Sequence, residues 1–430
     1  MRCTRICTPT QVLTQRFKDA YAKGEVVDVT SDSEDSSGTH GPVSPDLIQL
    51  IRDNDTGTLR DALRGGLQDI NTVDLKGCTA AYIAAEEGHT EALNLLIAAK
   101  ADLNKANVYG RTPLWIAASY GKLEALKLLI AAKADVNKAA NDGTTPAYVA
   151  AEEGHTEALK LLIAAKSDLN KADEDDWTPA FVAALHGMTE ALGVLIAAKA
   201  DLNKAAEDHR TPAYIAAQEG HTEALKLLIA AKADLNKARN NGATPAYIAT
   251  WTGQTEALKI LIAAKADVNK AMDGGYTPAY IAASRGKTEA LKLLIAAKAD
   301  LHKADRFGRT PAHVATLHSH TVALKLLFDA GADPYKEDRR WHTPLDEAME
   351  QRGGKRKREC LEIVWSAQKK RARHDPVACP RCRAEGGRSM ARPVFTKTSC
   401  PVCREDKDKV MVLRCGHVVC ADCLGKLRRV

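Results

Sequence analysis

Potential zinc ligands are concentrated near the C-terminus of the 430-residue chain. They are Cys400, Cys403, Cys415, His417, Cys420 and Cys423. The first two and the last two are each separated by two residues, and two thiolates at that spacing reach one tetrahedral zinc ion from a single tight turn. The chain begins without the apolar stretch of a secretion signal, so we expect a reducing compartment, where clustered cysteines bind metal rather than form disulfides.

The order of these ligands resembles the RING-type zinc finger, and the resemblance covers residues 400–430. In that family the first and third ligand pairs share one zinc ion. The resemblance therefore implies a complete first site, made of Cys400, Cys403, Cys420 and Cys423. The middle pair, Cys-x-His, would be half of a second site.

The completion of that second site is an open question, because the family's fourth pair, Cys-Pro-x-Cys, would follow residue 430. A pair of this form, Cys379-Pro-Arg-Cys382, lies upstream instead. The second site is then open in a chain shorter than its family, or it is closed by the upstream pair in a permuted order. As a third interpretation, the upstream pair forms a separate four-cysteine site with Cys400 and Cys403.

The RING resemblance implies a ubiquitin-protein ligase, which performs no covalent chemistry itself. Such a module holds a ubiquitin-conjugating enzyme and orients its thioester for attack. Val402 and Leu424 match the family's apolar contact positions for that enzyme. Elsewhere the chain lacks a phosphate-binding glycine loop, a nucleophile-elbow serine motif and a zinc-protease motif, so we predict no catalytic side chain.

The elements that carry this module follow from an internal repeat of 33 residues. Its marker is a glycine or a substitute, one variable residue and Thr-Pro. The marker begins at Gly110, Gly143, Asp176, His209, Gly242, Gly275, Gly308 and Trp341, with Gly77-Cys-Thr-Ala as an altered first copy. A segment such as EALKLLIAAKADLNKA, residues 157–172, separates the markers. Units of this size stack into solenoids because none of them buries its apolar face alone.

The repeat resembles the ankyrin repeat, whose pattern is T-P-L-H-x-A, a second helix and G-A-D, over roughly residues 45–367. The resemblance implies an all-α ankyrin-repeat solenoid of helix-turn-helix units, followed by the small zinc-stabilised module. Residues 45–67 and 343–367 are atypical copies, so we expect eight full helix pairs between two caps.

One unit illustrates the expected local structure. Thr112 suits a helix N-cap and the proline after it suits the first helical position, which predicts helices at about 113–120 and 123–132. Ala117 and Ala125 have an alanine counterpart in every one of the eight units, and such small side chains let neighbouring helices approach closely.

Two positions depart from the ankyrin pattern. The family's histidine is an aromatic residue in seven units and is kept only as His313. The glycine after the second helix is lysine in seven units and is kept only as Gly331. Because that position usually has a left-handed backbone, we expect either strained lysines or shifted helix ends.

Variable positions at the loop tips and at the ends of the first helices carry the information about a ligand, because ankyrin arrays share a fold and differ in partner. Several are occupied by residue types typical of binding hot spots, and we expect Trp177, Trp251, Tyr276, Phe307 and Arg309 among them to be exposed. The full set is Tyr109, Arg111, Trp177, Trp251, Tyr276, Phe307 and Arg309. We predict that they bind a protein substrate on the concave face; the alternative is drift at an unconstrained surface.

Two further motifs lie outside the repeat units. Val26, Val27 and Val29, followed by an acidic stretch, resemble a SUMO-interacting motif, with a disordered acidic linker as the alternative. Residues 352–373 contain nine Lys and Arg and resemble a two-part nuclear import signal, with a solvated basic face of the capping helix as the alternative. Nothing in this stretch supports nucleic acid as a partner.

The predicted organisation is a disordered tail (1–44), the repeat array with its caps (45–367), a basic linker with a CxxC pair (368–399) and a partial RING-type finger (400–430). We predict a zinc-binding ubiquitin-protein ligase that recruits substrate through the repeats. The alternative is a non-enzymatic ankyrin adaptor with a relic finger. No apolar run of membrane-spanning length occurs, and we expect an intracellular protein, cytoplasmic or nuclear.

Overall fold

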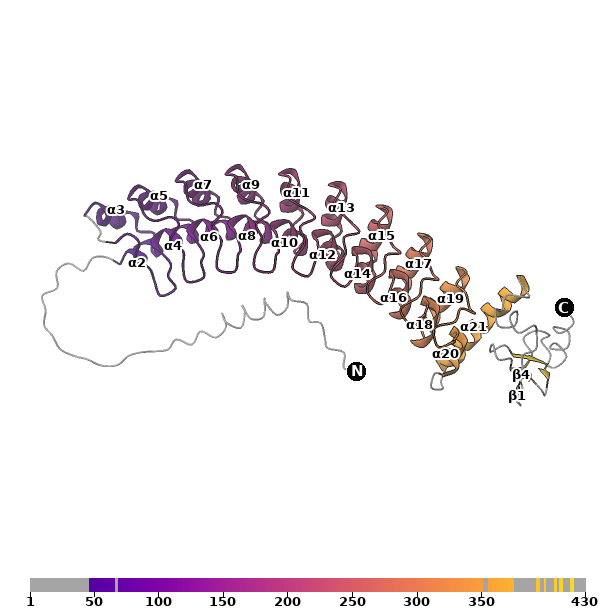
Figure 1. Ribbon diagram of the computed structural model, residues 1–430. Helices are drawn as coiled ribbons and strands as arrows, with labels where there is room; N and C mark the ends of the chain where they lie inside the picture. Colours follow the sequence, from indigo (N-terminus) through magenta and orange to yellow (C-terminus); the bar gives the residue numbers. More distant parts are fainter. Residues whose placement is uncertain are drawn as a thin grey trace, which may run out of the picture. The chain divides into compact units, whose positions relative to one another are not determined.

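The computed structural model describes residues 46–65, 69–350 and 355–374, together with five short strands between residues 392 and 420. In the first three of these ranges, helices follow one another in antiparallel pairs joined by loops (Figure 1). The strands belong to the C-terminal part of the chain.

Each 33-residue unit contributes two helices, and there are eight such pairs in the described part of the array. The first helices are α4 (Ala80–Glu87), α6 (Pro113–Ser119), α8 (Pro146–Glu152), α10 (Pro179–Leu185), α12 (Pro212–Glu219), α14 (Pro245–Thr252), α16 (Pro278–Ser284) and α18 (Pro311–Leu317). The second helices are α5 (Thr90–Ala98), α7 (Leu123–Ala131), α9 (Thr156–Ala164), α11 (Thr189–Ala197), α13 (Thr222–Ala230), α15 (Thr255–Ala263), α17 (Thr288–Ala296) and α19 (Thr321–Asp329).

First helices pack against first helices of neighbouring units, and second helices against second helices, so the array has two layers (Figure 1). The long loops extend from the layer of first helices. A shorter pair, α2 (Leu47–Arg52) and α3 (Thr56–Arg64), precedes the array, and α20 (Pro344–Glu350) and α21 (Lys355–His374) follow it. The predicted helical solenoid is confirmed.

The Thr-Pro steps begin the first helices for the expected reason. The hydroxyl oxygen of Thr112 accepts from the backbone N–H of Trp115 at 3.1 Å, and Pro113 occupies the first helical position. Both helices of this unit start at the predicted residue and end one residue earlier than predicted. The threonine cap and the proline after it therefore set the start of α6, whereas α7 begins without a side-chain cap.

The core is built from the residues that recur in every unit. Ala117 and Ala125 are buried, as are Leu126 and Leu129 on the inward face of α7. Burying one leucine side chain contributes about 1.5–3 kcal/mol, and the same positions are leucine in every other second helix. The apolar contacts therefore run continuously along the array, as stacked repeats require.

The lysines that replace the family glycine are strained rather than relaxed by a shifted helix end. All seven have a left-handed backbone, with φ between 57° and 64°. At Lys133, the amide donates to the carbonyl of Ile130, and the next amide, of Ala134, donates to that of Leu129, both at 3.0 Å. These two hydrogen bonds close the helix end and hold the lysine in place.

A second set of contacts joins the loops of neighbouring units through asparagine. The Oδ1 atom of Asn104 accepts from the backbone N–H of Asp135 at 2.8 Å, and its carbonyl oxygen accepts from Nζ of Lys138 at 2.7 Å. The same pair of bonds recurs from Asn71 to Asn269. In each case the donor belongs to the later unit and the acceptor to the earlier one.

Helix α21 differs from the predicted organisation, in which a linker begins at residue 368. The helix continues to His374, and Gln368 is buried. The hydroxyl of Tyr335 donates to the Gln368 carbonyl at 3.1 Å, and the Gln368 amide donates to the carbonyl of Pro334 at 3.3 Å. These bonds attach the last turns of α21 to the array.

The C-terminal strands are short and antiparallel. β1 (Arg392–Val394), β4 (Val410–Val412) and β5 (Val418–Cys420) form a sheet with the order β1-β4-β5, and β2 (Thr398–Ser399) pairs with β3 (Asp406–Lys407). Val412 pairs with Val418, so the connection from β4 to β5 spans residues 413–417.

Candidate protein-binding face

The five residues that end just before each cap threonine form a loop tip, which we call a finger. The nine fingers are 74–78, 107–111, 140–144, 173–177, 206–210, 239–243, 272–276, 305–309 and 338–342. In every finger after the first, the second residue donates its N–H to the carbonyl of the third residue of the preceding finger, over 2.7–3.2 Å. The fingers therefore form one hydrogen-bonded ladder along the array.

Several fingers are also braced internally by their first residue. A carboxylate or amide oxygen there accepts from the backbone N–H groups of the third and fifth residues. In finger 305–309, Asp305 accepts from Phe307 and Arg309, both at 2.9 Å, and in finger 338–342, Asp338 accepts from Arg340 and His342 at 2.8 and 2.9 Å. A braced finger holds its outer side chains on a rigid loop, which lowers the entropy cost of binding.

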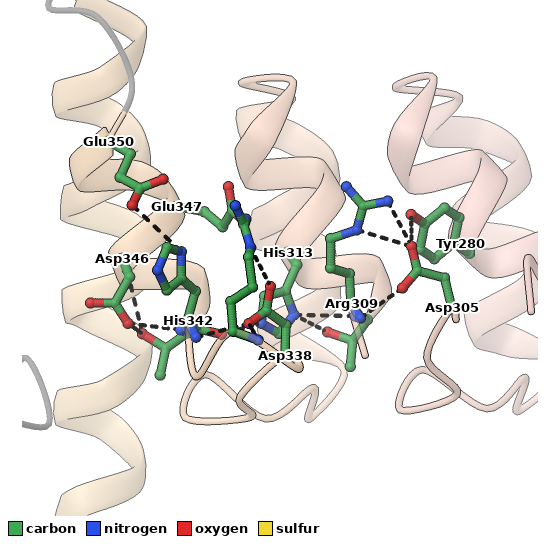
Figure 2. A network of polar contacts seen from close by, with 12 residues as sticks. Tyr280, Asp305, Arg309, His313, Asp338, His342, Asp346, Glu347 and Glu350 are labelled. Atoms are coloured by element: carbon green, nitrogen blue, oxygen red, sulfur yellow. Dashed lines mark hydrogen bonds and ion pairs between the residues drawn. The ribbon is translucent and has the colours of Figure 1, made fainter. Parts of the chain in front are cut away.

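The aromatic residue that replaces the family histidine contributes to the same bracing. The hydroxyl of Tyr280 donates to Asp305 at 2.8 Å, and the guanidinium of Arg309 donates to the same carboxylate at 2.8 and 2.9 Å (Figure 2). Burial raises the pKa of Asp305, but hydrogen bonds from the backbone of Arg309, from Tyr280 and from the guanidinium lower the pKa more, so the carboxylate stays ionised. Its charge neutralises that of Arg309.

Two of the seven predicted binding residues are exposed, and the other five are half-buried. Tyr109 is 56% exposed and Phe307 is 45% exposed. Trp177 packs against Phe181, with ring centroids 5.2 Å apart, and Tyr276 packs against Tyr280 at 5.0 Å. Each pair lies four residues apart, and its second member sits in the first turn of the following helix.

Trp251 and the two arginines of the set are also partly covered. Trp251 stacks on Tyr247, and the guanidinium of Arg285 lies over its ring, 3.4 Å from the centroid. Arg111 lies over the ring of Trp115, 4.4 Å from the centroid. The expected exposure was therefore wrong for Trp177, Trp251, Tyr276 and Arg309. Side chains of their own units pack against them or bind them, and at Trp251 the neighbouring unit also contributes Arg285.

The seven residues also do not converge on one point. They are distributed over fingers and first-helix ends from α6 to α18. The structure brings together Trp251 and Tyr276, which pack around an apolar cluster of Tyr214, Tyr247 and Ile281 on the first helices. The arrangement is that of an extended surface rather than of a pocket.

A family model for ankyrin repeats matches residues 47–140, 133–206, 183–272 and 264–338. The chain belongs to the ankyrin-repeat family. A second family model, described as a RING-type zinc-finger, matches residues 400–430, as the ligand order predicted.

Comparison of these ankyrin repeats with curated proteins and with solved structures gives less information. No curated protein matches the chain. Among solved structures, the crystal structure of the human ASB11 ankyrin repeat domain is 27% identical, with a TM-score of 0.47, and the match covers 52% of this chain and 100% of that one.

The predicted metal ligands fall largely outside the described residues. The exception is Cys420, which ends β5 and for which only the backbone is described. The predicted enzyme contacts Val402 and Leu424, the upstream pair Cys379 and Cys382, and the SUMO motif with Val26, Val27 and Val29 also lie outside. Within the described ranges, no group of three metal-binding side chains occurs and no helix is suited to crossing a membrane.

Two free cysteines have described side chains, Cys78 in the first finger and Cys360 in α21, and both are buried. Burial raises the pKa of the Cys78 thiol to about 11, so it stays protonated and acts as a small core residue. In α21, Arg356, Arg358 and Lys370 are exposed, as a solvated basic face requires, while nuclear import stays a prediction.

Sequence reasoning missed Trp341 as a surface residue. It stands at the fourth position of finger 338–342, where six of the nine fingers have glycine. Its side chain is 67% exposed and its backbone is left-handed, with φ at 64°. The signal was present in the alignment of the repeats, since a tryptophan at a glycine position is an uncommon substitution.

Proposed function

We propose that this chain is a RING-type ubiquitin-protein ligase whose ankyrin array captures the protein substrate. The observation that carries the proposal is the presence of both modules in one chain, with the repeats over residues 47–338 and the RING-type match over residues 400–430. The fingers and first helices present the substrate-binding face, and the zinc module recruits a ubiquitin-conjugating enzyme. The ligase transfers nothing itself and acts by bringing the two partners together.

The donor set of residues 400–430 suits zinc, because five thiolates and one imidazole are the ligands of structural zinc sites. Cys400, Cys403, Cys420 and Cys423 would hold the first ion. Cys415 and His417 follow β4 and precede β5 in the sequence, and they would supply two ligands of the second site. Zinc would supply folding energy to this small module and no catalysis.

The upstream pair, Cys379 and Cys382, is the candidate that would complete the second site. Val402 and Leu424 would provide the apolar contact to the conjugating enzyme. For the array, we propose a substrate-binding face that includes the exposed Tyr109 and Phe307.

Autoubiquitination by the purified full chain tests the proposal. With ubiquitin, ATP, activating enzyme and a panel of conjugating enzymes, the chain should form ubiquitin conjugates on itself. Leu424→Ala should reduce conjugation while keeping bound zinc, and Cys403→Ser should lose both. Zinc-loaded protein that is inactive with every conjugating enzyme would contradict ligase function.

That outcome would favour a second candidate, a non-enzymatic ankyrin adaptor. The observation behind this candidate is that the ankyrin-repeat match extends over residues 47–338, and such repeats bind a protein without any zinc module. An adaptor would bind substrate as tightly as the ligase does and would transfer no ubiquitin.

A further inference from the structure

The second residue of the fingers changes charge along the array. This is the residue whose N–H forms the ladder bond, so it occupies an equivalent place in every unit. Along the chain these residues are Val108, Asn141, Glu174, Glu207, Asn240, Asp273, Arg306 and Arg339. The ladder is therefore acidic in its middle and basic at its last two fingers.

Arg306 and Arg339 are available for a ligand. Both are exposed, and in the part of the chain that the structure describes neither forms an ion pair. Their finger neighbours are different, since Arg309 is bound to Asp305, and Arg340 lies 3.6 Å from Asp338 and 3.1 Å from Glu347. The positive charge that these two fingers offer to solvent comes chiefly from Arg306 and Arg339.

The same two fingers carry large exposed apolar side chains. Phe307 lies beneath the guanidinium of Arg306, 4.8 Å from it, and Trp341 is more exposed than any other large hydrophobic residue of fingers 107–111 to 338–342. A bulky residue with positive φ is a conformational outlier, and such strain persists where the surroundings hold it and a function uses it. Trp341 is held in this way by the brace of Asp338.

We propose that fingers 305–309 and 338–342 dock an acidic segment of a partner protein. Carboxylates of the segment pair with Arg306 and Arg339, and an apolar side chain next to them packs on Trp341 and Phe307. Aromatic and arginine side chains on a preorganised loop are the typical composition of a binding hot spot. This inference rests on the proposed function only in that the ankyrin array binds a protein, and it does not depend on ubiquitin transfer.

The charge pattern favours a short peptide segment over nucleic acid. Packed helices lie about 8–10 Å apart, so two neighbouring fingers cover only about 10 Å of a ligand. A long polyanion that continued toward the N-terminus would meet Asp273, and further along Glu207 and Glu174. An acidic stretch of a few residues avoids these carboxylates.

The ligand is obtained by selecting, from a displayed library of random 12-residue peptides, those that bind the full chain. We expect enrichment of peptides that combine Asp or Glu with an aromatic or aliphatic residue. The enriched peptide is then titrated against two double variants at the same ladder position. Arg306→Gln with Arg339→Gln should weaken binding about tenfold or more, and Glu174→Gln with Glu207→Gln should leave it within about twofold. Absence of acidic enrichment, or equal effects of both variants, would overturn the proposal, as would tighter binding of a single-stranded oligonucleotide.

Trp341→Gly separates binding from folding. Glycine adopts a positive φ without strain, so the midpoint of thermal unfolding should stay level or rise, while peptide affinity falls about 30-fold, the effect of a hot-spot tryptophan. Trp341→Phe should keep most of the affinity. A lower midpoint together with unchanged affinity would make Trp341 a structural residue and overturn its role. Because binding is measured without ubiquitin, an inactive ligase with normal peptide binding contradicts only the proposed function.

Discussion

The backbone amide of Thr310 donates to Nδ1 of His313 over 3.1 Å, while Nε2 of the same ring lies 3.0 Å from the carbonyl oxygen of His342. A ring nitrogen that accepts from an amide carries no proton, so Nε2 is the donor to His342. The imidazole is therefore held as one neutral tautomer that joins two units (Figure 2). The equivalent residue in the seven other units is Tyr, Trp or Phe, none of which titrates near neutral pH.

Stability should fall in mild acid because of this histidine. Burial lowers the pKa of His313 below the ordinary value of a histidine side chain. A group with a depressed folded-state pKa contributes stability that is present above the unfolded pKa and lost as the pH falls through the folded one. Urea unfolding of the full chain at about pH 7.5 and about pH 5.5 should show this loss, and His313→Tyr should reduce it.

The control for that experiment is His318, whose pKa is also lowered, first by burial and then by its neighbour His320. His318 is the C-cap residue of α18, and His318→Gln removes its titrating imidazole. The bond from His313 to the carbonyl oxygen of His342, which joins the two units, is left in place. If His318→Gln abolishes the acid sensitivity and His313→Tyr does not, the assignment to His313 is wrong.

Replacing a strained lysine by glycine should stabilise the array. Lys232 has φ at 60°, a left-handed conformation that costs a residue with a side chain about 1–2 kcal/mol. Glycine avoids this cost but loses about 0.5–1 kcal/mol on folding, because its unfolded backbone has more conformational freedom. We expect Lys232→Gly to raise the free energy of unfolding by about 0.5–1 kcal/mol, measured in urea. Lys232→Ala keeps the strain and should change little; an equal gain from both variants would refute the backbone explanation.

Two glycines with positive φ should respond differently to alanine. A Cβ atom added to Gly110 would lie 2.5 Å from the backbone nitrogen of Asn141, the residue that forms the ladder bond to Tyr109. A Cβ atom added to Gly331 would have no neighbouring atom within 4 Å. Gly331→Ala should cost about 1 kcal/mol from backbone strain alone. Gly110→Ala should cost about 1–3 kcal/mol more, because the two fingers must separate. If both variants lose the same free energy of unfolding in a denaturant titration, the ladder accommodates the added methyl group without cost and the prediction is wrong.

Zinc stoichiometry should distinguish the three ligand arrangements of the C-terminal module. Two ions per chain, one of them lost in Cys379→Ser, would support the permuted second site. One ion that survives Cys379→Ser would support an open second site. One ion lost in Cys379→Ser and in Cys403→Ser, but kept in Cys420→Ser, would support the separate four-cysteine site.

Metal removal should act only on the C-terminal module. A segment of about 30 residues buries too little apolar surface to fold alone, so we expect chelation to unfold it. The array has its own core, and the helical circular dichroism of the full chain should change little. Protein purified without chelator that contains no zinc by atomic absorption would contradict the metal-binding prediction.

The helical architecture could be read from the sequence because its signals are local. A threonine cap followed by proline placed the start of α6 at the correct residue, and the 33-residue period then placed every other first helix. The exposure of the variable residues could not be read in the same way. Trp177 and Tyr276 are half-buried because aromatic residues four positions later pack against them, and that depends on the side-chain contacts of each unit.

The docking of the last turns of α21 was missed for a related reason. Residues 368–374 are mostly basic and read as a linker, but the buried Gln368 bonds to Pro334 and Tyr335 in the preceding unit. These contacts are separated by more than thirty residues in the chain. Local sequence patterns therefore do not predict them.

The asparagine contacts between loops have a direction, and this bears on how the array is made. Asn104 accepts from Asp135 and Lys138 of the next unit, and every counterpart from Asn71 to Asn269 has the same sense. During synthesis the earlier unit leaves the ribosome first, so its acceptors are in place when the later donors emerge. Each new unit can then dock on an earlier unit that is already folded. We therefore expect vectorial folding, in which a stalled nascent chain would already hold a structured stack of its first units.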